Sequence, residues 1–160
     1  MNADINRKRG KPKPLTRRVS VQHTYEVPAD QLWSCCVSYR CLSAMMASLV
    51  TYQGLPDGEM QAGQSVDLQV THFKFTPPVN WHIDVLQRDD QNRVLQTSEY
   101  GGSFNTYLHT LTVDAQGERQ SRLTDHIEFD AGWLSLPMMW WVNHIYTKRD
   151  APRRLLLGLS

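Results

Sequence analysis

Residues 122–130, RLTDHIEFD, alternate apolar and polar side chains and point to the fold class of this chain. Leu123, Ile127 and Phe129 recur at every second position, which is typical of a strand with one buried face. Asp125 falls in step with them and is the one acid in that row. The opposite row is polar throughout and consists of Thr124, His126, Glu128 and Asp130. The sequence therefore predicts a strand that carries a carboxylate on its buried face.

Similar alternation elsewhere in the chain predicts further strands, separated by turns rich in Gly, Pro, Asp or Asn. The first predicted strand lies in 18–28 and ends at Pro28. Five more are predicted before the one that contains Asp125, in segments 48–58, 64–73, 80–87, 93–100 and 104–113. The order of these segments and their short connections predict an antiparallel meander.

Two regions have helical spacing. Segment 28–46 predicts two short helices broken near Ser38, and segment 137–157 predicts a long C-terminal helix. Pro152 should kink or interrupt the long helix, because proline lacks a backbone donor and clashes with the preceding turn. The fold class is therefore α+β, with a curved antiparallel sheet of about six to seven strands that closes over the C-terminal helix.

The C-terminal helix presents two predicted faces. Trp141, Ile145 and Met138 are separated by four and three residues, so the helical repeat predicts that they face the sheet together. Trp140 belongs with Asn143 and His144 on a neighbouring, more polar face, for which a position at the rim of a cavity is expected.

The N-terminal segment differs in composition from the rest of the chain. Seven of its first 18 residues are basic and one is acidic, whereas the whole chain has a net charge of +1. We interpret residues 1–17 as a disordered tail and 18–158 as one domain. The tail is either a solubilising leader or makes a weak electrostatic contact with nucleic acid or anionic lipid through residues 7–18.

Composition also bears on the cellular setting. Three cysteines, two of them adjacent, do not form a plausible disulfide framework and lack zinc-binding spacing, so reduced thiols are expected. The longest apolar runs are far too short for a transmembrane segment, which predicts a soluble, cytoplasmic protein. No metal or cofactor is predicted, and the sequence leaves the oligomeric state open.

Four motifs in the sequence share a family pattern. Pro28 and Trp33 stand at the start of the first predicted helix, and Trp81 opens the fourth predicted strand. Two later strands carry the remaining motifs, formed by Phe104, Tyr107, His109, Leu111 and Val113 and by Leu123, Asp125, Ile127 and Phe129. Over about residues 18–157 these motifs resemble the START-like, Bet v 1-type (SRPBCC) helix-grip superfamily, and the chain looks most similar to its bacterial ligand-binding, polyketide-cyclase-like group. The resemblance implies a ligand cavity between the sheet and the C-terminal helix.

The chain departs from the pattern of that group at three positions. Tyr107 replaces a usual tryptophan, Leu111 replaces a second histidine, and Glu99 replaces a usual glutamine. The change at Leu111 removes a group that would contact a ligand. Glu99 either adds charge to the cavity or lies at its mouth.

His109 and Asp125 are the candidate catalytic residues. Their strands are joined by a hairpin and both side chains are expected on the inner face, so the histidine could reach the carboxylate. A buried carboxylate is costly unless it is hydrogen-bonded or paired. Three readings remain open: a pair that stabilises the sheet, a pair that orients a ligand or moves a proton, or a register that separates the two.

The other candidate ligand-binding residues have equally ordinary interpretations. His23 is a core histidine or a ligand contact, and Tyr25 lies on the same strand face. Trp81, Trp140 and Trp141 are expected to form cavity wall or core, with a recognition cage as the alternative. Met138 could give an adaptable wall or fill an irregular core.

Three functions are consistent with these features. The leading hypothesis is a non-enzymatic module that binds a small hydrophobic ligand. The second is an enzyme of cyclase, dehydratase or hydrolase type that uses His109 and Asp125 as acid and base. The third is an interaction protein whose basic tail acts on RNA, the ribosome or lipid. Signatures of phosphate-binding loops, serine hydrolases and helical zinc proteases are missing from the sequence.

Overall fold

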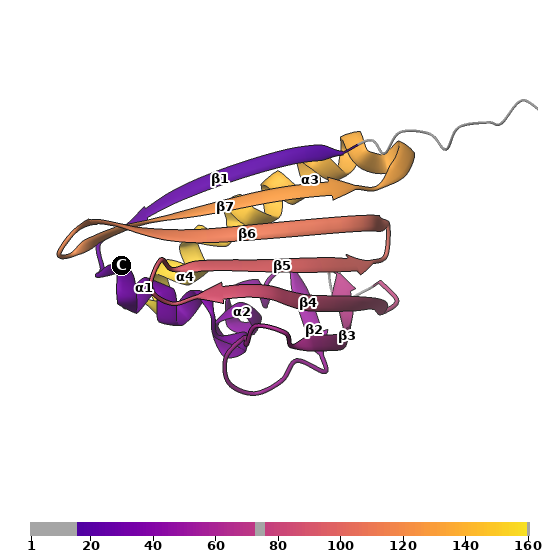
Figure 1. Cartoon of the computed structure of the whole chain (residues 1–160). Helices are drawn as coiled ribbons and strands as arrows, with labels where there is room; N and C mark the ends of the chain where they lie inside the picture. The colour runs from indigo at the N-terminus through magenta and orange to yellow at the C-terminus, as the bar shows by residue number, and fades with distance from the viewer. Residues whose placement is uncertain (1–15, 73–75, 160) are drawn as a thin grey trace, which may run out of the picture.

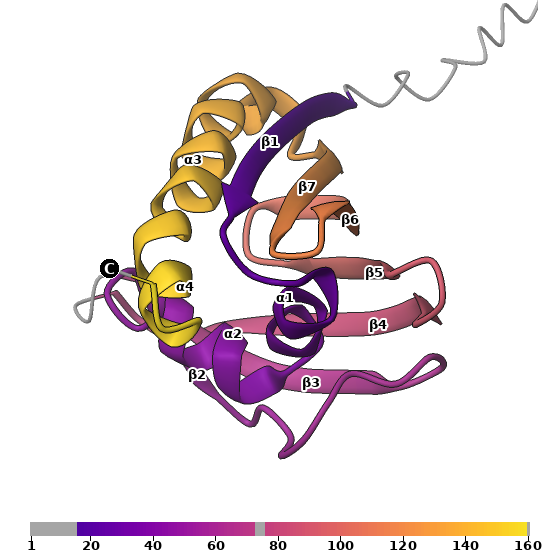
Figure 2. The same ribbon diagram turned by 90° about the vertical axis from the view of Figure 1, so that its left-hand side faces the viewer.

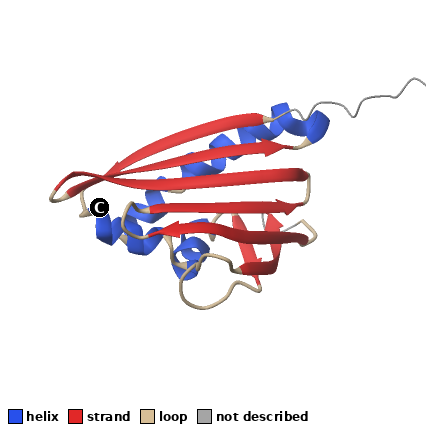
Figure 3. Cartoon of the chain, in the orientation of Figure 1, coloured by secondary structure: helices blue, strands red, loops and turns tan. Residues whose placement is uncertain are grey.

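The computed structural model describes residues 16–72 and 76–159. Seven strands and two helical regions follow in the predicted order (Figures 1 and 3). The strands are β1 (Arg17–Tyr25), β2 (Val50–Gln53), β3 (Ser65–His72), β4 (Val79–Asp89), β5 (Val94–Gly101), β6 (Phe104–Gly117) and β7 (Gln120–Asp130). The helices are α1 (Ala29–Cys36), α2 (Tyr39–Met46), the short 3-10 turn η1 (Gly132–Leu134), α3 (Ser135–Lys148) and α4 (Asp150–Leu156).

All seven strands form one antiparallel sheet in the order β1-β7-β6-β5-β4-β3-β2. Figure 2 shows α3 and α4 running along one side of this curved sheet, with α2 beside α4 and α1 next to α2. The predicted α+β architecture is confirmed.

Strand β7 has the most deeply buried inner face. Its inward row is completely inaccessible to solvent and consists of Ser121, Leu123, Asp125, Ile127 and Phe129. The strand lies between β1 and β6, and α1 packs over its inner face. The alternation in the sequence therefore reflects burial, and it includes the carboxylate.

The sheet bends where the pairing register shifts. One such irregularity lies between Glu99 and Gly101, at the β5–β6 turn. A Cβ atom at Gly101 would overlap the carbonyl oxygen of Asn80 and lie 2.8 Å from the ring of Trp81. Glycine is required at this position because the β4 backbone approaches so closely.

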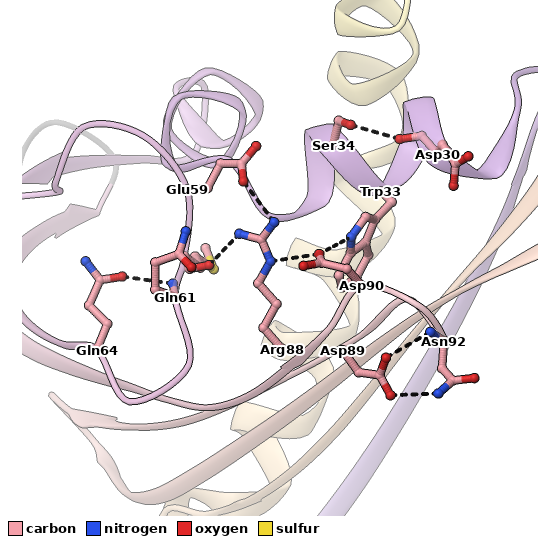
Figure 4. Close-up of polar contacts among 11 residues, drawn as sticks. Asp30, Trp33, Ser34, Glu59, Gln61, Gln64, Arg88, Asp89, Asp90 and Asn92 are labelled. Atoms are coloured by element: carbon pink, nitrogen blue, oxygen red, sulfur yellow. Dashed lines mark hydrogen bonds and ion pairs between the residues drawn. The ribbon is translucent and has the colours of Figure 1, made fainter.

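A polar network fixes α1 against the β4–β5 turn of the sheet. Arg88 pairs with Glu59 at 2.9 Å and with Asp90 at 2.8 Å, and it donates to the carbonyl of Met60 (Figure 4). Trp33 of α1 donates its indole N–H to the same Asp90 carboxylate at 2.8 Å. The helical segment is interrupted between α1 and α2, as predicted near Ser38. The Ser38 side chain caps the start of α2 by accepting a hydrogen bond from the Cys41 N–H.

The C-terminal helix is interrupted at Arg149, between α3 and α4. Pro152 explains the break, because it cannot donate to the carbonyl of Lys148 and its ring crowds that turn. The buried stripe is centred on Val142 and Tyr146, each 2% exposed, and continues through Arg149 into α4.

The predicted sheet-facing stripe is therefore displaced by one residue. Met138, Trp141 and Ile145 are half-buried and flank the stripe instead of forming its centre. The prediction followed apolar residues alone, whereas arginine side chains occupy two positions of the true stripe. Trp140 is 69% exposed and stacks on His144, in keeping with the more polar face expected for it.

Domain limits differ slightly from the prediction. β1 begins at Arg17, one residue before the expected boundary, and Leu159 still packs on the core. Most of the proposed disordered tail, residues 1–15, lies outside the described residues. No helix within 16–72 or 76–159 is long and apolar enough to cross a membrane.

Candidate functional site

A cavity of about 120 Å³ lies between the concave face of the sheet, α2 and the α3–α4 helix. An engineered apolar cavity of roughly 150 Å³ can admit benzene, so this space suits a small organic molecule. Its wall is largely apolar and includes Met46, Val70, Ile83, Leu95, Leu111 and Val142. A few polar side chains interrupt this wall, and their arrangement determines the chemistry of the site.

His109 and Asp125 form a buried pair beside the cavity. His109 lies opposite Ile127 in the β6–β7 register, so Asp125 is its diagonal neighbour on the same face. The distance from His109 Nε2 to Asp125 Oδ1 is 2.8 Å. Both residues are buried, His109 with 8% of its surface exposed and Asp125 with none. The predicted contact is confirmed. His109 lines the cavity, and Asp125 lies behind it.

The Asp125 carboxyl is held in its ionised form. Burial alone raises the pKa of a carboxyl group, but the hydrogen bond from His109 and the charges of Arg153 and Arg149 lower the pKa of Asp125 below its ordinary value. His109 Nε2–H is therefore the donor, and its Nδ1 is the ring nitrogen left for other contacts. The second carboxylate oxygen, Oδ2, is buried and has no hydrogen-bond partner among the described residues.

Two tyrosines extend this polar group along the cavity. The hydroxyls of Tyr107 and Tyr146 are hydrogen-bonded at 3.0 Å, and the Tyr146 ring lies edge-on to the His109 ring at 5.1 Å. Burial raises the pKa of both phenols well above the ordinary value. Both hydroxyls therefore stay protonated and act as neutral hydrogen-bonding groups.

Glu99 lies in the cavity wall with both carboxylate oxygens engaged. Oε2 accepts from the indole N–H of Trp81 at 2.8 Å, and Oε1 accepts from the hydroxyl of Thr97 at 2.8 Å. Of the two positions considered for this glutamate, the structure supports the one that adds charge to the cavity.

The structure brings together only part of the predicted binding set. Cavity-lining positions are occupied by Trp81, Glu99, Tyr107, His109 and Trp141, with Asp125 immediately behind. His23, Tyr25 and Met138 are not in the lining of this cavity. His23 approaches Asp150 at 3.5 Å, Tyr25 is completely buried, and Met138 packs against the part of the core that includes Val142 and Tyr146.

Sequence reasoning missed three polar residues of the long helix. Tyr146, Arg149 and Arg153 all line the cavity. Their spacings of three and four residues place them on one helical face, and this periodicity is visible in the sequence. The signal was overlooked because the helical stripe was traced only through apolar residues.

Comparisons with solved structures support the fold. Norcoclaurine synthase from Thalictrum flavum, a point mutant in complex with a transition state analogue, has a TM-score of 0.69 at 16% identity, covering 92% of this chain and 98% of that chain. Another structure of that enzyme holds dopamine and hydroxybenzaldehyde, with a TM-score of 0.67 at 15% identity, covering 92% of this chain and 90% of that chain.

Two further solved proteins have similar architecture. Protein CV1439 from Chromobacterium violaceum has a TM-score of 0.68 at 8% identity, covering 88% of this chain and 96% of that chain. Ara h 8.0201 has a TM-score of 0.68 at 10% identity, covering 89% of this chain and 99% of that chain. No family model and no curated protein sequence matches the chain. The likeness therefore rests on structure, and this chain has the Bet v 1-type, START-like helix-grip fold.

Proposed function

We propose that the protein binds a small, largely apolar molecule in the cavity between the sheet and the α3–α4 helix. The observation that carries this proposal is the cavity itself, an apolar space of about 120 Å³ with a few converging polar groups. Ligand sites usually combine an apolar wall with a small number of fixed polar contacts. The bound molecules in norcoclaurine synthase, a protein of the same fold, add support.

Native mass spectrometry of the purified full-length protein provides the first test, because a retained ligand appears as an added mass that denaturation removes. A Leu111→Phe variant should lose that mass, since the larger ring fills the cavity. Thr112→Phe is the matched control, because its side chain lies on the opposite face of β6. Equal ligand retention by both folded variants would contradict binding in this cavity.

Acid–base catalysis is the second candidate function, and the His109–Asp125 pair favours it. An imidazole at the cavity wall, oriented by a buried carboxylate, is a common arrangement for a general base. If the protein is an enzyme, His109→Gln should abolish turnover of the bound molecule while its affinity is retained. Unchanged turnover in that variant would exclude His109 as the catalytic base.

An exposed apolar patch favours the lipid version of the tail hypothesis. Trp133, Leu136 and Trp140 are 86%, 59% and 69% exposed. β1 pairs Arg17 with Phe129, so the basic segment joins the domain close to this patch. Tryptophan and leucine beside cationic residues suit the surface of an anionic membrane better than RNA.

Vesicle sedimentation tests this third function. The full chain should bind phosphatidylserine vesicles, and deletion of residues 1–15 or the double change Trp133→Ser and Trp140→Ser should each weaken binding. Binding of RNA that depends on the tail but not on the tryptophans would favour the nucleic-acid alternative.

A further inference from the structure

The two buried arginines of the described chain lack a carboxylate partner. Arg149 is 9% exposed and Arg153 is 1% exposed, and both line the cavity. The better solvated arginines with an ion-pair partner, at N–O distances of 2.7–3.3 Å, are Arg18, Arg88, Arg93 and Arg154. This distribution is the reverse of what stability alone favours, because an unpaired charge is most costly where it is buried.

Neutral groups make the direct contacts of both guanidinium groups. Arg149 donates from Nε to Met46 Sδ at 3.0 Å, and its guanidinium carbon lies 4.0 Å from the centre of the Tyr146 ring. Arg153 donates from Nη1 to the Tyr25 hydroxyl at 3.0 Å, whereas its Nε is buried without a partner in the described structure. Guanidinium groups stay protonated in proteins, so both positive charges persist.

The acidic groups nearby do not satisfy these arginines. Glu99 lines the cavity, but both of its oxygens already accept hydrogen bonds from Trp81 and Thr97. Asp125 lies behind His109 and is not part of the cavity wall. The ionised Asp125 acts on both arginines through its charge, but neither guanidinium group is hydrogen-bonded to a carboxylate within the described structure, and both line the cavity.

We propose that the cavity binds a small apolar monocarboxylic acid whose carboxylate is held by Arg149 and Arg153. This inference rests on the proposed ligand-binding function and names its substrate class. The arginines lie on successive turns of one helical face and present planar donors that match a carboxylate. A single negative charge is repelled less by the carboxylates of Glu99 and Asp125 than a phosphate dianion would be.

Calorimetric titration with matched pairs of ligands provides the test. Phenylacetate, hexanoate and decanoate are compared with phenylethanol, hexanol and decanol, each pair sharing its apolar body. At least one acid should bind the wild-type protein about tenfold or more tightly than its alcohol, corresponding to about 1.4 kcal/mol. Arg149→Gln should remove this preference, whereas Arg18→Gln, a change at an exposed arginine paired with Glu128, should leave it intact.

Glu99→Gln gives a second test that retains both arginines. Loss of its negative charge should strengthen binding of the acid and leave binding of the alcohol unchanged. The folded state of each variant is checked by circular dichroism before titration.

The outcomes separate the two proposals. Equal binding of acids and alcohols by wild-type protein overturns the carboxylate assignment but leaves apolar ligand binding intact. Tighter binding of benzylphosphonate than of phenylacetate overturns the choice of a monocarboxylate. Failure of every acid and alcohol to bind, together with no retained mass in native spectra, overturns both proposals.

Discussion

At the scale of single residues, Asp125 shows how one buried acid is accommodated in an apolar row. Its inward neighbours along β7 are Leu123 and Ile127, and its compensation comes from His109 on the adjacent strand. Removing the histidine leaves a buried carboxylate without its hydrogen bond. The contact is therefore expected to contribute to stability whether or not it also serves a ligand.

We predict that His109→Ala lowers the free energy of unfolding by about 3–5 kcal/mol, the usual cost of leaving a buried charged group without its partner. The double variant His109→Leu and Asp125→Leu should recover part of this loss, because both polar groups are then removed. Urea denaturation measures both changes. A double variant less stable than His109→Ala would contradict the explanation by unpaired charge.

His82 on the outer face of the sheet should make stability depend on pH. Hydrogen bonds to Asp67 and Asp84, at 2.6 and 3.0 Å, raise the pKa of His82 in the folded protein. This contribution is fully present below the unfolded pKa of about 6.5 and is lost as pH rises through the folded pKa. The stability advantage of wild type over His82→Gln should therefore shrink with rising pH in denaturation measurements. An advantage that grows from pH about 6 to 9 would refute this linkage.

At the scale of secondary-structure elements, the long helix has one buried face and one exposed face that carries Trp140. Tyr146 is 2% exposed and bonded to Tyr107, whereas Trp140 is 69% exposed. We predict that Tyr146→Ala costs about 3–5 kcal/mol of stability, as other large-to-small core changes do. Trp140→Ala should change stability by less than about 0.5 kcal/mol. Guanidinium denaturation decides this, and similar losses in both variants would show that the helix faces are wrongly assigned.

The sequence was sufficient to predict the elements but not the detailed neighbours. Alternation along β6 and β7 determines which side chains face inward, so His109 and Asp125 were correctly placed on one face. It does not determine which inward residues become diagonal neighbours. In the long helix, the presence of Arg149 and Arg153 on the buried stripe violates the rule that such stripes are apolar. The prediction traced the stripe through apolar residues alone and therefore missed both arginines.

At the scale of the whole molecule, the described fold begins at the first strand. β1 begins at Arg17 and is paired with β7 from its first residue. We predict that deletion of residues 1–15 shifts the melting temperature by less than about 2 °C, since the basic, proline-containing composition of this segment offers little apolar surface to bury. Calorimetry measures the shift. A much larger decrease would show that the tail packs on the domain.

The two edge strands of the sheet, β1 and β2, bear on self-association. An edge strand with free backbone groups can recruit a strand from another molecule. At one edge β2 is only four residues long, and at the other edge α3 packs against β1 (Figure 2). The helix that closes the cavity therefore also shields the longer edge strand. Local detachment of α3 would expose both an open cavity and a template for intermolecular β-pairing, so a ligand that holds this helix in place should also slow aggregation.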